Sequence, residues 1–193
     1  MKAVAINGSP RKGGNTELLL RKTLAPIAAA GHQTDYIQVG GTRIRGCTAC
    51  GACGRMKNKR CVIDDDIFNL AFAKMIEADA ILIGSPSYFA DLTAETKALI
   101  DRAGRVGLAN GGLLRRKIGA GVVAARRGGA VHVLDSIHHM FLMSEMVVPG
   151  STYWNFGLGC EPGEVLADAE ALANMKNLGE QIAWLFSLME KHG

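Results

Sequence analysis

Short apolar runs alternate with longer amphipathic stretches along most of the chain. Runs of about four to eight mostly apolar residues are typical of buried strands, and apolar positions spaced three and four apart are typical of helices. The pattern predicts five strands, over residues 3–6, 34–39, 80–84, 118–125 and 146–149. It also predicts five helices, over residues 16–30, 66–78, 93–105, 131–144 and 164–190.

This alternation predicts a parallel sheet with helices on both faces. Five such units match an α/β, doubly wound three-layer sandwich, and we expect the flavodoxin-like strand order 2-1-3-4-5. In that order a ligand crevice opens at the carboxyl ends of the strands, where the connections of the first and third strands diverge. The loops at residues 7–16, 84–91 and 125–130 are therefore expected to meet.

Several residues indicate where the predicted helices end or break. Gly31 suits the position after the first helix, whereas Pro26 should kink or shorten that helix. Gly179 is a point at which the long last helix is expected to break. The acidic run at residues 64–66 supplies a cap and negative charge to the second helix, an interpretation that we favour over a magnesium site.

Composition narrows the class of protein. The chain has 193 residues, of which 48% are hydrophobic and 21% charged. This length and composition predict a single domain over residues 1–193, with an irregular, cysteine-bearing loop at 40–61. A net charge of +4 suits a small anionic ligand and is too small to indicate nucleic-acid binding. Aromatic residues make up 6% of the chain, which also argues against a base-stacking surface.

The apolar runs are too short for membrane insertion or secretion. None approaches the length of a membrane span, and the run at residues 3–6 is shorter than the core of a secretory signal. We therefore expect a cytoplasmic protein without membrane contact. In a reducing cytosol, clustered cysteines indicate metal or redox chemistry more often than disulfides, and the chain has five cysteines.

The loop between the first strand and the first helix is rich in glycine and hydrogen-bonding residues. In INGSPRKGGNTELLL, residues 6–20, the glycines allow the backbone to wrap closely around a ligand. The helix N-terminus that follows favours an anion. The dinucleotide motif G-x-G-x-x-G is absent, and Gly14 and Asn15 stand where a P-loop needs lysine and Ser/Thr. A terminal monophosphate needs neither residue, so FMN fits this loop.

Together with three later segments, this loop resembles the NADPH-dependent FMN reductase and iron–sulfur flavoprotein group of flavodoxin-fold proteins. GSPRKGGNTELLL, residues 8–20, resembles the phosphate loop of that group. GSPSYFADLTAETKALIDR, residues 84–102, resembles its flavin-ring loop and following helix, and ARRGG, residues 125–129, resembles a third loop near the flavin. GCTACGACGRMKNKRCVIDDD, residues 46–66, resembles its cysteine segment. The resemblance covers the chain to about residue 160.

The resemblance implies a set of cofactor-binding residues. The FMN phosphate would be held by Ser9, Arg11, Asn15 and Thr16. The isoalloxazine ring would lie along Pro86, Ser87, Tyr88 and Phe89, and its other side or polar edge would contact Gly128 and Gly129. The arginines of the same loops would favour an anionic reduced flavin or attract the phosphate of NADPH; they are Arg11, Arg126 and Arg127.

Four of the cysteines form a cluster in the sequence. Cys47, Cys50 and Cys53 form C-x2-C-x2-C, and Cys61 follows. Bacterial ferredoxins use the same first spacings for a [4Fe–4S] cluster, whereas zinc usually takes two separated pairs. The resemblance to iron–sulfur flavoproteins extends to the longer gap before the fourth cysteine. Cys160 lies far away in the sequence, and we expect it to be an unliganded thiol.

Two interpretations of the cysteine segment remain open. In the first, the basic residues between Cys53 and Cys61 offset the charge of a cluster and ease its reduction. These residues are Arg55, Lys57, Lys59 and Arg60. In the second, no cluster is present, and the basic run is a solvated loop or binds the phosphate of NADPH.

Two further segments carry side chains of interest. His138 and His139 are adjacent on a predicted helix and point about 100° apart, so they do not form a joint metal site. We expect one of them to face the core and the other to face solvent. STYWNFGLG, residues 151–159, would pack in the core, border the flavin pocket or form a dimer contact.

These features predict an FMN-dependent oxidoreductase, of the NAD(P)H-dependent flavin or quinone-type reductase kind. The flavin carries the chemistry, so no side chain is expected to be an obligatory acid or base. The alternative is an iron–sulfur flavoprotein that acts as an electron carrier with a ferredoxin-like partner. The resemblance implies a homodimer or homotetramer, with NAD(P)H and a small-molecule or protein electron acceptor as partners.

Overall fold

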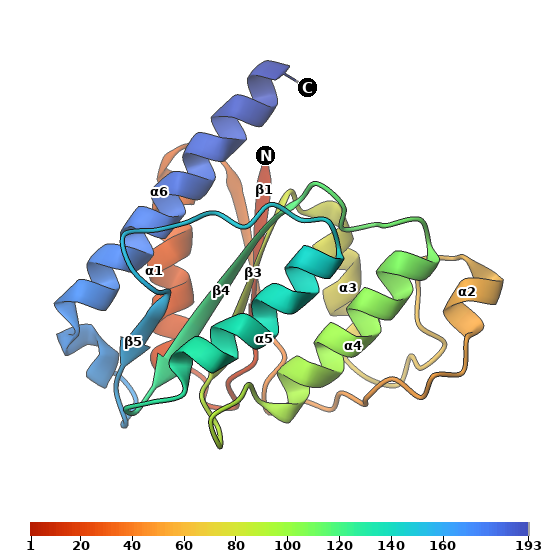
Figure 1. Ribbon diagram of the computed structural model, residues 1–193, viewed down its shortest axis with the longest axis horizontal. Coiled ribbons are helices and arrows are strands. Elements are labelled where there is room, and N and C mark those ends of the chain that lie inside the picture. Colours follow the sequence, from red (N-terminus) through yellow and green to blue (C-terminus); the bar gives the residue numbers. More distant parts are fainter. Residues whose placement is uncertain (193) are drawn as a thin grey trace.

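A computed structural model describes residues 1–192 as three layers, with helices on both sides of a central sheet (Figure 1). The strands are β1 (Lys2–Asn7), β2 (Gln33–Gln38), β3 (Ala80–Pro86), β4 (Ile118–Ala125) and β5 (Phe156–Leu158). The α-helices are α1 (Asn15–Ala29), α2 (Ala52–Met56), α3 (Phe68–Glu77), α4 (Ala94–Ala109), α5 (Ala130–Met143) and α6 (Ala169–His192). A 3-10 helix, η1 (Glu164–Ala167), precedes α6.

The sheet has the order β2-β1-β3-β4-β5, and every neighbouring pair is parallel. This confirms the flavodoxin-like fold predicted from the alternation of strands and helices. The carboxyl ends of the strands lie along the lower edge in Figure 1, and both chain ends lie along the opposite edge.

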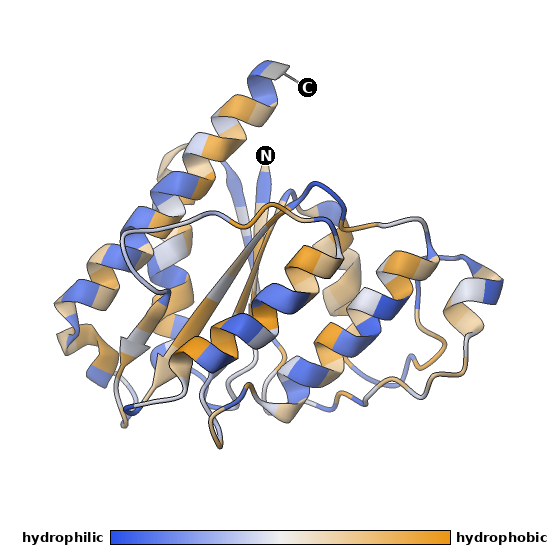
Figure 2. Cartoon of the chain, in the orientation of Figure 1, coloured by the Kyte–Doolittle hydropathy of each residue, from blue (hydrophilic) through white to orange (hydrophobic). Residues whose placement is uncertain are grey.

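Two hydrophobic cores lie on opposite faces of the sheet. Val4 and Ile6 of β1 pack with residues of α3, α4 and α5, whereas Ala3 and Ala5 pack with residues of α1 and α6. This division follows from the two-residue period of a strand, which sends alternate side chains to opposite faces. Figure 2 shows the central strands as hydrophobic and the outer helix faces as mixed.

The fifth strand is not where the sequence predicts it. Within residues 146–149, Val147 forms only an isolated parallel bridge with Ile118, at the start of β4. Pro149 has no N–H to continue a ladder, and β5 forms later, against the other end of β4. Asn174 of α6 holds the preceding segment through hydrogen bonds to the backbone of Tyr153 and Trp154. The hydrogen bonds from Asn174 therefore hold the segment that leads into the edge strand β5.

Pro26 and Gly179 meet where α1 and α6 pack together. An added Cβ at Gly179 would lie 2.5 Å from Pro26 Cγ and 2.2 Å from the Thr23 carbonyl oxygen. The glycine therefore lets the two helices approach closely. The predicted break at Gly179 is wrong, because α6 is continuous there, and α1 continues past Pro26 to Ala29.

The loop predicted at 40–61 contains a short helix, α2, which the sequence did not indicate. None of the described helices is long and apolar enough to cross a membrane. His138 is partly buried beside Phe141 and His139 is exposed, as expected for adjacent positions on α5.

Candidate functional site

The loops that follow β1, β3 and β4 meet at the carboxyl edge of the sheet around a cavity of about 180 Å³. Most of the residues predicted to hold phosphate and flavin ring line this one cavity. Its lining residues are Ser9, Arg11, Asn15, Thr16, Pro86, Ser87, Tyr88, Ala124, Arg126, Gly159, Cys160 and Pro162. The fold thus brings together four segments that are far apart in the printed sequence, at residues 9–16, 86–88, 124–126 and 159–162.

Polar side chains at the ends of β1 and β2 form hydrogen bonds that hold the first loop in place. The amide of Gln38 donates to the carbonyl oxygens of Ser9, at 2.5 Å, and Gly40, at 2.7 Å. Asn7 accepts the N–H of Ser9 and donates to Tyr36 and Gln38. Burial raises the pKa of Tyr36 to about 12, so its hydroxyl stays protonated in this network. Sequence reasoning did not assign Asn7, Tyr36 or Gln38 to the site.

The backbone around Ser9 leaves no room for larger residues. An added Cβ at Gly40 would lie 2.3 Å from the carbonyl oxygen of Gly8. An added Cβ at Gly8 would lie 1.8 Å from the hydroxyl oxygen of Thr96. These contacts fix the position of the loop immediately before α1, and only glycine allows them.

The start of α1 has the properties of an anion site. No side chain caps the helix at Gly14, so its first N–H groups remain available to a ligand. Glu17 accepts the N–H of Gly13 at 2.8 Å and pairs with Arg21. Burial acts to raise the pKa of Glu17, but these two partners outweigh it and lower the pKa.

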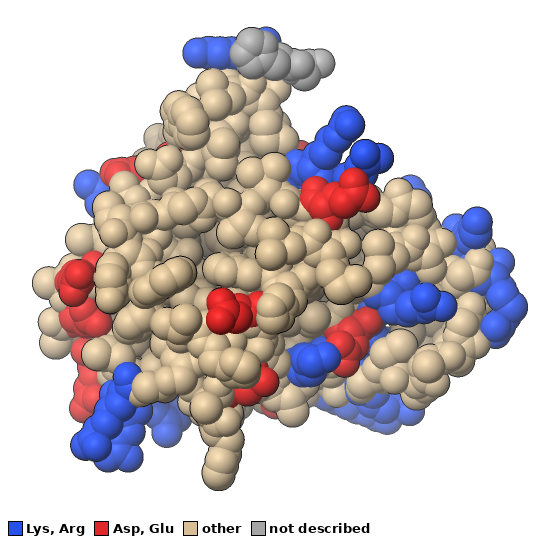
Figure 3. Space-filling model, in the orientation of Figure 1, with Lys and Arg blue, Asp and Glu red and all other residues tan. Residues whose placement is uncertain are grey.

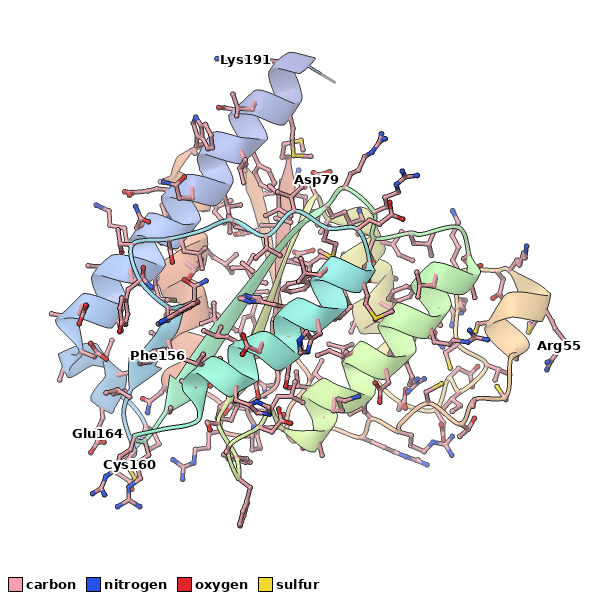
Figure 4. The ribbon with its side chains drawn as sticks, viewed as in Figure 1. Arg55, Asp79, Phe156, Cys160, Glu164 and Lys191 are labelled. Atoms are coloured by element: carbon pink, nitrogen blue, oxygen red, sulfur yellow. The ribbon has the colours of Figure 1, made fainter. Side chains whose placement is uncertain are left out.

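Two predicted phosphate residues also bind the loop after β5. Arg11 Nη1 donates to the Cys160 carbonyl oxygen at 2.9 Å. Asn15 Nδ2 donates to the Glu161 carbonyl oxygen, and Asn15 Oδ1 accepts the N–H of Gly163. Glu164 accepts the N–H groups of Glu161 and Cys160, which lower the pKa of its carboxyl group. Cys160 and Glu164 lie together at one corner of the carboxyl edge (Figure 4).

The loop after β3 is a tight turn. Tyr88 and Asp91 exchange two backbone hydrogen bonds, and the two residues between them have φ values of 48° and 66°. Left-handed backbone is unfavourable for residues other than glycine, such as Phe89 and Ala90 here, so the turn is strained. Phe89 is fully exposed at its tip and does not line the cavity, unlike Tyr88.

The loop after β4 differs from the expectation in detail. Arg126 lines the cavity, whereas Arg127, Gly128 and Gly129 do not. Instead, Gly128 accepts a long hydrogen bond from the Ser87 hydroxyl. An added Cβ at Gly129 would lie 2.7 Å from the same hydroxyl oxygen. The two glycines therefore contact the ring loop from outside the cavity, immediately before α5 begins at Ala130.

The aromatic segment at 151–159 is divided between two cavities. Gly159 lines the cavity at the carboxyl edge. Tyr153 and Trp154 line a separate, larger cavity of about 530 Å³, together with Leu134 and His138. The rings of Tyr153 and Trp154 therefore line a different cavity from the one beside the phosphate loop.

All four clustered cysteines line one small cavity between their own segment and α4, of about 20 Å³. Cys47 and Cys50 are exposed, Cys61 is partly buried and Cys53 is buried. Across residues 1–192, no three Cys, His, Asp or Glu side chains are already gathered as a metal-binding group. A group bound by all four thiols therefore requires their segment to rearrange around it.

A buried ion pair joins the two ends of the cysteine segment to α4. Arg102 Nη1 lies 2.5 Å from Asp66 Oδ2, and their side chains are 1% and 0% exposed. Arg102 also donates to the carbonyl oxygens of Arg45 and Ile63, which flank the segment. Burial acts to raise the pKa of Asp66, but the hydrogen bond from Arg102 and those from backbone N–H groups outweigh it and lower the pKa.

Two asparagines hold the cysteine backbone directly. Asn69 accepts the N–H of Cys61 and donates to its carbonyl oxygen, both at 2.9 Å. Asn110 accepts the N–H of Lys59 and donates to the Cys53 carbonyl oxygen at 3.4 Å. No motif indicates these asparagines or Arg102. Arg102 and Asn110 bind backbone that is distant in the chain, and Asn69 binds the irregular segment shortly before its own helix.

The surroundings of Cys50 lower the pKa of its thiol and favour the thiolate. The N–H of Ala52, the Thr48 hydroxyl and the charge of Arg55 lower its pKa. The thiolate is the form of cysteine that binds metals, so this environment suits a ligand.

The basic residues after Cys53 form an exposed surface over α2. Arg55, Lys57, Lys59 and Arg60 are all exposed, and Figure 3 shows the positive charge gathered at that end of the molecule. In Figure 4, Arg55 lies far from Cys160 and Glu164. The cysteine segment and the cavity beside Cys160 are thus separate regions of one chain.

Comparison with known proteins gives consistent matches. The family described as NADPH-dependent FMN reductase matches residues 1–160. An iron–sulfur flavoprotein of Methanocaldococcus jannaschii is 36% identical over 99% of this chain and 100% of its own length. An iron–sulfur flavoprotein of Methanosarcina thermophila is 31% identical over 100% of this chain and 98% of its own length.

Solved structures show the same fold at lower identity. RosB, solved with the intermediate 8-demethyl-8-formylriboflavin-5'-phosphate, superimposes with a TM-score of 0.76. It is 17% identical, and the match covers 99% of this chain and 81% of that one. An archaeal flavodoxin gives a TM-score of 0.61 at 17% identity, over 95% of this chain and 96% of the other.

Proposed function

Because this chain belongs to the NADPH-dependent FMN reductase family and is a flavin-dependent oxidoreductase, we propose that it takes electrons from NAD(P)H and passes them to a flavin, a quinone-type molecule or a protein acceptor. The observation that carries the proposal is the cavity at the carboxyl edge, where the glycine-rich first loop faces the loop after β3.

The residues of this cavity fit FMN. The phosphate would be held by the uncapped N-terminus of α1 with the side chains of Ser9, Arg11 and Thr16. Gly8 and Gly40 create a cradle that a Cβ would fill. Asn15 contributes by holding the loop at 161–165 against the same cavity, in addition to lining it.

The ring of the flavin would lie along Pro86, Ser87 and Tyr88. When bound, FMN supplies hydride and electron transfer at its own ring atoms. The side chains position the ring and set its charge environment. Arg126 is the cation of the third loop that lines the cavity, so we assign to it the attraction of a flavin or NAD(P)H phosphate.

A second function is favoured by the cysteine segment. We propose that Cys47, Cys50, Cys53 and Cys61 hold a [4Fe–4S] cluster and that the protein exchanges electrons with a ferredoxin-like partner. Two relatives of nearly the same length are named iron–sulfur flavoproteins. Four thiols around one cavity, one of them with a lowered pKa, are the donor set that such a cluster needs.

We further propose a cytoplasmic homodimer or homotetramer. The fully exposed Phe89 and the half-exposed Tyr153 and Trp154 are apolar surfaces that a second copy would bury.

One experiment separates these functions. Protein purified without oxygen is examined by absorption spectroscopy, and iron and acid-labile sulfide are measured. Stopped-flow kinetics then compare flavin reduction by NADPH with reduction by a reduced ferredoxin. Rapid reduction by NADPH supports the reductase, and sluggish reduction by NADPH with rapid reduction by ferredoxin supports the carrier. A colourless protein that does not take up FMN would refute both.

A further inference from the structure

Arg102 of α4 is an arginine buried in the wall of the cysteine cavity. Its Nη1 atom donates to Asp66 and to the Arg45 carbonyl oxygen, and its Nη2 atom donates to the Ile63 carbonyl oxygen. Its guanidinium group lies over the ring of Phe68, at 4.1 Å from the centroid. Within residues 1–192, the buried Nε atom has no hydrogen-bond partner.

An unpartnered N–H on a buried cation is unusual. Leaving such a donor unsatisfied destabilises a fold, and most buried donors in proteins have a partner. The ion pair with Asp66 accounts for the charge of Arg102 and for one of its nitrogens, but it leaves Nε without an acceptor. The cavity beside the side chain is lined by Cys47, Cys50, Cys53 and Cys61, whose deprotonated sulfurs are acceptors.

We propose that Arg102 is a positioning residue for the group held by the four cysteines, and that its Nε–H donates a hydrogen bond to a sulfur of that group. This inference rests on the proposed cluster. The bonds from Nη1 and Nη2 hold the guanidinium plane in one orientation, so the Nε–H direction is set before any group binds. Among residues 1–192, no other group accepts a hydrogen bond from Nε.

Such a bond has a measurable electrochemical effect. Reduction adds negative charge to a thiolate-bound cluster, so a hydrogen bond to its sulfur stabilises the reduced state more than the oxidised state. Removing the donor should make the cluster about tenfold harder to reduce, which is about 59 mV for a one-electron couple.

The test compares Arg102→Lys with Arg105→Lys in the full chain, by redox titration followed by electron paramagnetic resonance. Lysine at 102 keeps a cation for Asp66 but has no second nitrogen for the cavity. Arg105 lines the same cavity from the same helix but is exposed, so its replacement is the matched control. We expect a lower potential in Arg102→Lys, with iron content retained, and no change in Arg105→Lys.

Each other outcome contradicts the inference in a distinguishable way. Equal potentials in Arg102→Lys and wild type, or equal shifts in both variants, overturn the role of Nε. Wild-type protein that binds no iron refutes the proposed cluster itself, and the inference falls with it.

If Arg102→Lys does not hold iron, a second measurement decides. Wild-type protein labelled with ¹⁵N-arginine is loaded with Cd²⁺, a diamagnetic ion that binds thiolates, and the Arg102 Nε–H resonance is identified by its absence in the lysine variant. A resonance that shifts and becomes protected from exchange on loading supports the hydrogen bond. An unchanged resonance assigns to Arg102 a purely structural role.

Discussion

Asn15 Oδ1 accepts the backbone N–H of Gly163 at 2.8 Å, and this bond joins the first turn of α1 to a loop 148 residues further along the chain. The same side chain donates to the Glu161 carbonyl oxygen. Asn15 therefore holds two walls of the cavity at the carboxyl edge together.

Replacing Asn15 by alanine should weaken both folding and cofactor binding. The loop at 161–165 loses its hydrogen bonds to α1, and we expect a loss of about 1–3 kcal/mol in the free energy of unfolding. Asn15→Asp keeps an oxygen for Gly163 but adds a negative charge beside the phosphate. Asn15→Asp should therefore be more stable than Asn15→Ala but should also bind FMN more weakly than wild type does. Thermal unfolding measures the first effect and calorimetric titration the second. Tight FMN binding by Asn15→Ala would contradict this role.

The two adjacent arginines of the loop after β4 should differ. Arg126 lines the cavity and Arg127 does not, so Arg126→Gln should lower the affinity for FMN about tenfold because a charge-assisted contact is lost. Arg127→Gln is the matched control and should bind normally. Titration with FMN and with riboflavin shows whether the loss depends on the phosphate. Equal losses in the two variants would mean that the side chain of Arg127 also reaches the cofactor.

Gly40 should not tolerate a methyl group. Its Cβ would lie 2.3 Å from the Gly8 carbonyl oxygen, which is backbone and cannot rotate away. We expect Gly40→Ala to lower the free energy of unfolding by about 1–3 kcal/mol and to weaken FMN binding. Gly150→Ala is the control, because nothing lies within 4 Å of its Cβ position. A Gly40→Ala protein as stable as Gly150→Ala would disprove the close approach.

The thiol of Cys50 should react at lower pH than an ordinary thiol in the metal-free protein. The N–H of Ala52 and the hydroxyl of Thr48 stabilise the thiolate and lower the pKa, and only the thiolate is alkylated. Rates of iodoacetamide modification, followed by mass spectrometry across pH, should therefore rise earlier than for a small reference thiol. Thr48→Val should move the profile towards higher pH. An unaltered profile would exclude the hydroxyl as a cause.

Removal of Asp66 should be costly. Asp66→Ala leaves Arg102 buried without its counterion, and we expect a loss of about 3–5 kcal/mol in the free energy of unfolding. Because the pKa of Asp66 is lowered in the fold, its contribution is fully present above the unfolded value of about 3.9. It is lost as the pH falls through the folded value, so wild type and variant should converge in acid.

A neighbouring residue provides the control for this prediction. Asp65→Ala removes ion pairs with Arg43 and Arg45 that lie on the surface. Exposed pairs contribute little, so its urea-unfolding midpoint should stay near that of wild type. Similar losses at both positions would show that the burial of Asp66 is not what matters.

The sequence predicted the first four strands and the helices around them with small shifts at their ends. Helix α1 begins at Asn15 rather than Thr16, and α4 continues to Ala109 rather than ending at Arg105. These elements follow local patterns of apolar residues, so they can be recognised without knowledge of the neighbours. The fifth strand could not be recognised, because Phe156–Leu158 is short and is placed by β4 and α6.

Prediction of the site was strongest where the residues are consecutive. Ser9, Arg11, Asn15 and Thr16 all lie within residues 9–16, at the start of α1 and in the loop before it, and they line one cavity. The choice between Arg126 and Arg127 depended on where the chain turns into α5, which no motif shows. In the cysteine segment, Ala49, Lys57 and Lys59 adopt left-handed backbone that their residue types do not favour. Its path is therefore imposed by the surrounding protein.

The amino-acid order alone determined the α/β alternation, the glycine-rich first loop and the grouping of four cysteines, because each of these features is a pattern of residues that are close together along the chain. Tertiary structure decided which strand completes the sheet, which arginine faces the cavity, and how Arg102 and Asp66 close the cysteine segment. Those outcomes depend on burying polar and charged groups against partners 36 or more residues away. A local pattern carries no record of such partners, since the cost of burial appears only when the layers have packed.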